Sequence, residues 1–371
     1  MSAVLVLPLA GMPELTAGDD LAALLLQAAE RSAQGLHPGD VLVVTSKALS
    51  KVLDLAVPSA TDREALVLEQ SRRVLVERRV GADGITRVVE SLAGPVMAAA
   101  GIDGSNTGAE HRWLLLPGDP DGEARRLREA LLAARGWSAD TALAVIVSDT
   151  AGRPWRAGLV DFALGAAGIE VFEDHRGDLD ADCRPLAVTT RAIADELATA
   201  ADLVKGKVAG IPAAIVRGLA REFFAAEGDG ARALVRTGRG DWFALGHVEA
   251  VRSALGAPPG SAAARDVGIP SDSDGFGDRV HRVIALALLG CGEVAVDLEL
   301  AQTTARLTAS AVDERALGRV LARLEVAASS EGLTVAASED TTLVLTDGTE
   351  VGARARFDAD PDGGVPPRAV R

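Results

Sequence analysis

Two segments of the chain place positively charged side chains where they could bind a phosphate. Ser46, Lys47 and Lys51 follow the apolar run Val41–Val44, and a lysine just beyond a buried strand can present a compact positive charge. Residues 152–156 carry two arginines, which pair with phosphate or carboxylate through parallel hydrogen bonds. A solvated loop in the first case and a surface ion pair in the second are the open alternatives.

Two further segments offer oxygen ligands for a hard divalent cation. Asp103 and Asn106 lie in a stretch interrupted by glycines, and Asp149 and Thr150 follow the apolar run Ala142–Val147. Two carboxylates and a hydroxyl from separate segments suit Mg²⁺ or Mn²⁺, which share phosphate oxygens with a nucleotide. The competing interpretation is that both aspartates cap turns or helices.

Each of the four segments is expected to be a polar loop, and together they predict metal-assisted handling of a phosphorylated ligand. The sequence contains no G-x-x-x-x-G-K-[ST] phosphate loop, no G-x-S-x-G elbow and no H-E-x-x-H motif. The residues alone therefore leave a ligase, a kinase and a phosphatase open.

The composition of the chain excludes some classes of binding partner. The chain has 371 residues, of which 48% are hydrophobic and only 3% aromatic, and its formal net charge is −15. An acidic surface repels nucleic acid and anionic lipid, so we expect no nucleic acid and no membrane as partners. Cys183 and Cys291 lie far apart and indicate no disulfide framework. Without a basic leader or a long apolar run, the sequence predicts a cytoplasmic protein.

The polar segments must be positioned by a mixture of strands and helices. Strict alternation of strand and helix is absent from the pattern, which favours the α+β class over a doubly wound sheet. The expected strands are Val4–Pro8, Val41–Val44, Ala142–Val147 and Ala213–Val216, and the expected helices are Asp19–Gln34, Thr61–Arg79, Asp121–Arg135 and Thr190–Val204.

A change in composition predicts more than one domain. Residues 1–256 form the expected main domain, and the Gly-, Pro- and Ser-rich residues 257–277 the expected linker. Residues 278–357 then form a small α/β domain at the carboxyl-terminal side, and residues 358–371 a tail.

From Leu7 to Leu255 the sequence resembles the coenzyme F420-0:L-glutamate ligase family, also called the F420-0:gamma-glutamyl ligase family, of the actinobacterial type. The resemblance rests on several blocks that occur in the family's order. These blocks are Met12–Leu15, Gly18–Asp20, Gly39–Val41, Thr45–Lys51, Ala100–Asn106, Leu116–Asp121, Ser148–Arg156, Asp195–Leu197 and Val216–Leu219.

The resemblance implies a GTP-dependent ligase that joins L-glutamate to the phospholactyl carboxylate of coenzyme F420-0 and could extend a γ-glutamyl tail. It implies an acyl-phosphate intermediate and a two-subdomain α+β fold in an intertwined homodimer. The alternatives are an amide ligase of the same family acting on another phosphorylated carboxylate, and a non-catalytic GTP-binding relative.

The same resemblance assigns roles to individual residues. By position, GTP would contact Met12, Pro13, Glu14, Leu15, Ser46, Lys51 and Asn106. Asp103 and Asp149 would hold one Mg²⁺ or Mn²⁺ and Thr150 a second, with K⁺ as a further candidate ion, and Asp103, Asp149 and Lys51 would be catalytic. Lys207 stands where some relatives carry an acidic or amide residue near the second ion.

Overall fold

The chain forms two compact units. The computed structural model describes residues 3–32, 35–81, 84–107, 111–237 and 241–347. Of the described residues, the first unit contains those up to Glu249 and Pro259–Ser261, and the second contains Ala250–Pro258 and Ala262–Asp347.

A five-stranded sheet with the order β1-β12-β2-β8-β9 forms the core of the first unit. Its strands are β1 (Leu5–Pro8), β2 (Asp40–Thr45), β8 (Leu143–Arg153), β9 (Arg156–Ala167) and β12 (Ala213–Arg217). Strands β2 and β8 run parallel, and the other neighbouring pairs are antiparallel. This mixed architecture is consistent with the predicted α+β class.

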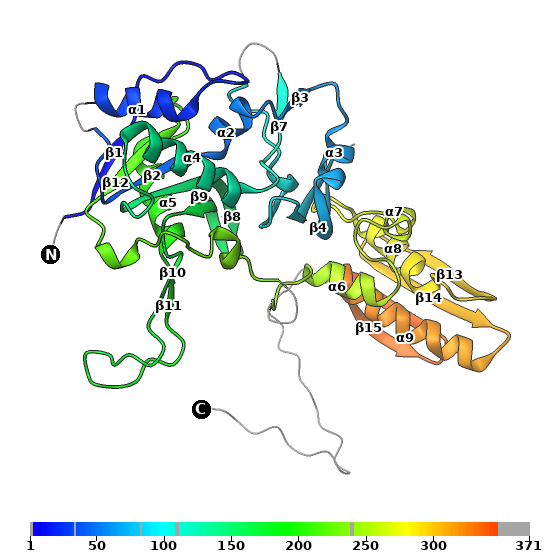
Figure 1. The fold of residues 1–371 in the computed structure, drawn as a ribbon. Helices are drawn as coiled ribbons and strands as arrows, with labels where there is room; N and C mark the ends of the chain where they lie inside the picture. Colours follow the sequence, from blue (N-terminus) through cyan, green and yellow to red (C-terminus); the bar gives the residue numbers. More distant parts are fainter. Residues whose placement is uncertain (1–2, 33–34, 82–83, 108–110, 238–240, 348–371) are drawn as a thin grey trace. The chain divides into compact units, whose positions relative to one another are not determined.

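Helices cover both faces of the sheet (Figure 1). Helices α1 (Leu21–Arg31) and α4 (Pro120–Arg135) pack on one face, and α5 (Ile193–Lys205) packs on the other. Leu42 belongs to the first apolar layer and its neighbour Val43 to the second. The runs Val41–Val44 and Leu143–Val147 are therefore apolar at every position, which confirms the prediction of strands buried on both faces.

The ends of α4 follow the expected chemistry of helix caps. The Asp119 side chain accepts a hydrogen bond from the Gly122 N–H, and Pro120 occupies the first turn. Gly136 ends the helix with a φ of 66°, a left-handed conformation that glycine adopts without a steric penalty.

Two polar segments expected as loops are regular structure. Residues Ser46–Val52 form helix α2, which begins where β2 ends. Residues 148–153 continue β8 instead of leaving the sheet, because β9 pairs with them as the antiparallel partner. A register shift between Val147 and Ser148 accompanies this change from the apolar to the polar half of the strand.

The prediction of a long helix over Thr61–Arg79 is wrong. The structure contains the short helix α3 (Arg63–Glu69), and Ser71–Val80 form strand β4. Within β4, Leu75 and Glu77 are buried on one face of the strand, so the alternation of side chains follows the period of a strand. Pairing with β5 supplies the hydrogen bonds that a helix would have supplied locally.

Smaller sheets and short helical segments complete the first unit. The sheets are β4-β5-β6 with β5 (Gly84–Ser91) and β6 (Val96–Ala98), β3-β7 with β3 (Ala56–Pro58) and β7 (Arg112–Leu114), and β10-β11 with β10 (Phe172–Asp174) and β11 (Thr190–Ala192). The short 3-10 segments are η1 (Ala99–Gly101), η2 (Arg221–Phe223) and η3 (Ala231–Leu234).

The second unit packs helices on one antiparallel sheet of order β13-β14-β16-β15. Its strands are β13 (Val294–Leu300), β14 (Thr304–Ala311), β15 (Leu333–Glu339) and β16 (Thr342–Asp347), and its helices are α7 (Ala262–Val267), α8 (Phe276–Leu288) and α9 (Glu314–Ser330). Helix α6 (His247–Ala254) contains the boundary between the units. No helix in the described ranges has both the length and the apolar character needed to cross a bilayer.

The linker expected over residues 257–277 is folded structure. Helix α7 lies within it, and Ala257 and Val267 are buried in the core of the second unit. The glycines and prolines of this segment predict a linker, although its apolar residues pack in the core. The tail expected over residues 358–371 lies outside the described residues.

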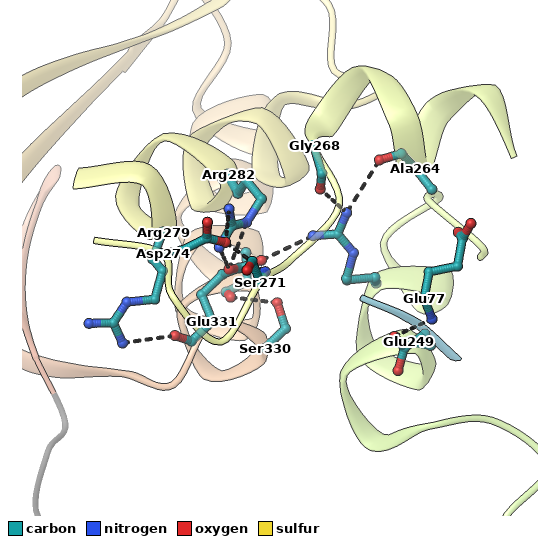
Figure 2. A network of polar contacts seen from close by, with 12 residues as sticks. Glu77, Glu249, Ala264, Gly268, Ser271, Asp274, Arg279, Arg282, Ser330 and Glu331 are labelled. Carbon is teal, nitrogen blue, oxygen red and sulfur yellow. Dashed lines mark hydrogen bonds and ion pairs between the residues drawn. The ribbon is translucent and has the colours of Figure 1, made fainter. Parts of the chain in front are cut away.

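A buried ion network holds the second unit together (Figure 2). The Glu331 carboxylate accepts hydrogen bonds from Arg252 at 3.0 Å and from Arg282 at 2.7 Å. Arg282 also pairs with Asp274 at 2.7 Å. Because these charges are withdrawn from water, they need partners of opposite sign, and Glu331 is such a partner for both arginines.

Candidate active site

One cavity of about 580 Å³ in the first unit brings together residues from three of the four predicted polar segments. Its wall includes Pro13–Leu15, side chains of α2, and residues 104–107. The opposite side is lined by the polar ends of β8 and β9 and by the segment from Asp202 to Pro212. Residues far apart in the chain therefore meet around a single space large enough for a small phosphorylated molecule.

All four lysines of the chain line this cavity. The sequence contains 34 arginines but only four lysines, namely Lys47, Lys51, Lys205 and Lys207. No arginine is among the described residues that line the cavity. Outside this cavity the chain uses arginine as its basic residue. A lysine carries a compact ammonium group on a flexible side chain, which can adjust its position to bind a phosphate.

Helix α2 positions the first two lysines. Lys47 and Lys51 are four residues apart and therefore lie on the same face of the helix. Lys51 forms an ion pair with Glu14, which brings the segment before α1 to the cavity. Lys47 forms an ion pair with Asp103 at 2.6 Å.

Asp103 is fixed at the edge of the cavity. Its backbone forms an isolated bridge with Leu114, and its carboxylate accepts a hydrogen bond from the Ser105 N–H at 2.7 Å. Partial burial raises the pKa of Asp103, but the hydrogen bond and charge of Lys47 outweigh burial and hold this pKa below its ordinary value. The carboxylate is therefore ionised, and its partner in the structure is the Lys47 ammonium group.

Asp149 lies in a desolvated position on the lining of the cavity. Burial raises the pKa of Asp149 to about 6, although the Thr150 N–H and the Ser46 hydroxyl donate hydrogen bonds to the carboxylate. Asp161 also raises this pKa, and Lys207 lowers it. A desolvated carboxylate that faces a cavity is typical of a functional site.

A chain of hydrogen bonds joins β8, β9 and α5 beside Asp149. Lys205 donates to Asp161 at 2.8 Å and to the Ser148 hydroxyl at 2.6 Å. Thr150 donates to Asp161 at 2.7 Å, and Lys207 donates to the Thr150 hydroxyl at 2.7 Å. Burial raises the pKa of Asp161, but Lys205 and the two hydroxyl groups outweigh it, so the net shift is downward.

Most of the predicted site residues meet at the cavity. Its lining includes Pro13, Glu14, Leu15, Lys51, Asn106, Asp149 and Thr150. Three others are set back from the lining: Ser46 is buried and bonds to Asp149, Asp103 pairs with Lys47, and Met12 packs against the apolar core.

The two arginines of residues 152–156 lie elsewhere. Arg153 and Arg156 flank the exposed turn of the β8–β9 hairpin and do not line the cavity. The sequence analysis missed the site residues Asp161, Asp202 and Lys205. The scarcity of lysine is the signal that could have found Lys205.

The carboxylates of the cavity fit one divalent ion better than two. Among the described residues, no group of three or more His, Cys, Asp or Glu side chains could hold a metal. Mg²⁺ commonly uses one or two carboxylates together with phosphate oxygens and water, so Asp149 on the cavity lining fits the role of a ligand to one ion that a nucleotide would complete. At Thr150 the hydroxyl is already engaged by Lys207 and Asp161, which does not fit a second ion.

The fold and the cavity define an α+β protein whose candidate active site combines four lysines with desolvated carboxylates. The family model described as F420-0:Gamma-glutamyl ligase matches residues 11–218, and the chain belongs to this family. The predicted resemblance is thereby confirmed.

Relatives named coenzyme F420:L-glutamate ligase are similar over most of their length. The one from Methanothermobacter thermautotrophicus is 39% identical over 227 residues, which cover 56% of this chain and 86% of that protein. The one from Methanopyrus kandleri is 40% identical over 243 residues, or 61% and 92% of the two chains. The one from Archaeoglobus fulgidus is 38% identical over 233 residues, or 58% and 87%.

Proposed function

We propose that this protein is a GTP-dependent ligase that joins L-glutamate to the phospholactyl carboxylate of coenzyme F420-0. The observation that carries the proposal is the cavity lined by every lysine of the chain, with Asp149 also on its lining. The names of the relatives support F420-0 and glutamate as substrates.

The reaction needs a leaving group on a carboxylate. A carboxylate oxygen of F420-0 attacks the γ-phosphorus of GTP, and GDP leaves with its bridging oxygen. The resulting acyl phosphate is attacked at its carbonyl carbon by the amine of glutamate. Phosphate then leaves, the amine loses a proton, and an amide bond remains. This sequence balances atoms and charge with GTP as the energy source.

Charge repulsion is the main barrier, since GTP, F420-0 and glutamate are all anions. Lys47 and Lys51 on α2 would bind the phosphates of GTP, together with Ser46, Asn106 and the segment Met12–Leu15. Asp103 and Asp149 would hold a divalent ion, which supplies charge neutralisation at the transferring phosphoryl group.

The protein is also proposed to act as a homodimer. Residues 172–192 leave the sheet as a hairpin arm whose base is the β10-β11 pair (Figure 1). On this arm Leu179 and Val188 are 62% and 86% exposed, respectively. Apolar side chains so exposed favour a contact with a second copy. Light scattering tests this point: a mass of one chain would contradict it.

Mass spectrometry of the products tests the reaction. Incubation with F420-0, GTP, Mn²⁺ and glutamate is expected to give F420 species that are heavier by one or more glutamyl residues. The matched control is Asp149→Asn, which should give none. GTP binding without any glutamylated product would favour a non-catalytic relative, and product only from another phosphorylated carboxylate would favour a ligase with a different acceptor.

A further inference from the structure

Carboxylates and ammonium groups alternate on the cavity wall formed by β8, β9 and the end of α5. Asp161, Asp202, Lys205 and Lys207 all line this wall. Asp161 and Lys205 pair at 2.8 Å, with side chains only 5% and 3% exposed. The charge of Asp161 is therefore balanced by a lysine buried beside it.

Thr150 stands at the centre of this wall with its hydroxyl group engaged on both sides. The hydroxyl donates its proton to Asp161 at 2.7 Å and accepts a hydrogen bond from Lys207 at 2.7 Å. A divalent ion bound to the same oxygen would lie within a few ångströms of the Lys207 ammonium. Like charges at that distance repel strongly in a partly desolvated site.

The numbers of lysines and acids in the whole cavity lining also argue against a second divalent ion. Four acids line the cavity, namely Glu14, Asp149, Asp161 and Asp202, against four lysines. Asp103, outside the lining, pairs with Lys47, so the ammonium groups balance most of these carboxylates and leave little excess negative charge for a second dication.

We propose that the Lys207 ammonium group takes the place of a second divalent ion at Thr150, so that the cavity binds one divalent ion, at Asp149. Lys207 then supplies a positive charge on the Thr150 side of the phosphoryl group, without a second metal. This proposal rests on the proposed metal site, and it corrects the expectation of two ions.

The metal alone tests the proposal without any turnover. Bound Mn²⁺ is measured in the full-length, nucleotide-free protein from the loss of the free-ion signal in electron paramagnetic resonance. We expect one Mn²⁺ per chain in the wild type and in Lys207→Arg, which keeps the charge. Lys207→Glu adds a carboxylate beside Thr150, Asp161 and Asp202, and should bind two.

Lys207→Gln is a milder second variant. It removes the charge and offers an amide oxygen, so it should also gain the second ion. Circular dichroism shows whether each variant is folded. If a variant does not fold, the number of Mn²⁺ ions bound per wild-type chain still tests the proposal.

The outcomes separate this proposal from the proposed function. Two ions in the wild type, or one ion in folded Lys207→Glu and Lys207→Gln, would overturn the role of Lys207. Asp149→Asn should lose the single ion. If it binds as many ions as the wild type, the metal site of the proposed function is misplaced. No bound ion in the wild type would overturn both.

Discussion

Ser46 and Asp149 meet because β2 and β8 are parallel and in register. Thr45 lies opposite Ser148, so the next residue on each strand reaches the same edge of the sheet. The Ser46 hydroxyl donates a hydrogen bond to the Asp149 carboxylate there. Polar residues at the carboxyl ends of parallel strands commonly form binding sites for this reason.

Ser46→Ala tests the orienting role of this contact. Loss of a hydrogen bond that orients a metal-binding carboxylate should weaken Mn²⁺ binding about 10- to 100-fold. Titration of the protein with Mn²⁺ measures the change. Ser50→Ala is a matched control on the same helix, because the Ser50 hydroxyl bonds to the Leu115 carbonyl instead. Equal Mn²⁺ affinity in both variants would remove Ser46 from the site.

Asp149→Asn should change how stability depends on pH. The pKa of Asp149 is raised by burial to about 6, from an ordinary value of 3.8. A raised carboxyl pKa means that the folded state binds the proton more tightly than the unfolded state does. The resulting stabilisation is complete below the ordinary value and is lost as the pH rises through the folded pKa.

The wild type should therefore lose stability relative to Asp149→Asn between about pH 4 and about pH 6. Urea unfolding of both proteins in metal-free buffer measures this difference. A difference in the free energy of unfolding that stays constant over this range would contradict the burial of the carboxylate.

Lys51→Ala should weaken GTP binding without unfolding the protein. A hydrogen bond to a charged group contributes about 1.5–3 kcal/mol, which corresponds to roughly 10- to 100-fold in the Kd for GTP. Calorimetry measures the Kd. Arg126→Ala removes an exposed cation that pairs only with its helix neighbour Glu123 in the described structure, and it should leave the Kd unchanged. Equal affinities for the two variants would argue against a phosphate role for Lys51.

Lys205→Met should destabilise the protein through Asp161. Removing one partner of a buried ion pair leaves an uncompensated charge and costs about 3–5 kcal/mol. The double variant Lys205→Met with Asp161→Asn removes both charges and should recover part of this loss. Denaturant unfolding of the two variants gives the comparison, and a double variant no more stable than Lys205→Met would show that the pair is not coupled.

The sequence predicts those parts of the site that depend on local pattern. The apolar runs before Ser46 and Asp149 identify β2 and β8, and two apolar runs of this kind are expected in one sheet. Asp161 reaches the site only because β9 pairs with β8 and sets Thr150 opposite it. Such a register depends on contacts distant in sequence, so the residues around Asp161 carry no local signal for it.

The wrong prediction of a helix over Thr61–Arg79 also results from contacts that are distant in sequence. Asp62 does begin a helix, and its side chain caps α3 by accepting from the Glu64 N–H. The chain then becomes β4 because β5 pairs with it, and this partner overrides the local preference of Leu75 and its neighbours for either state.

Acetylation of lysine side chains, mapped by mass spectrometry with and without GTP and Mg²⁺, tests the central claim most directly. Every lysine of the chain lines the cavity, so each modified lysine reports on that site alone. The account predicts that GTP slows acetylation of Lys47 and Lys51 at least several-fold, roughly in proportion to site occupancy. Unchanged rates at both lysines under saturating GTP would show that the nucleotide binds elsewhere.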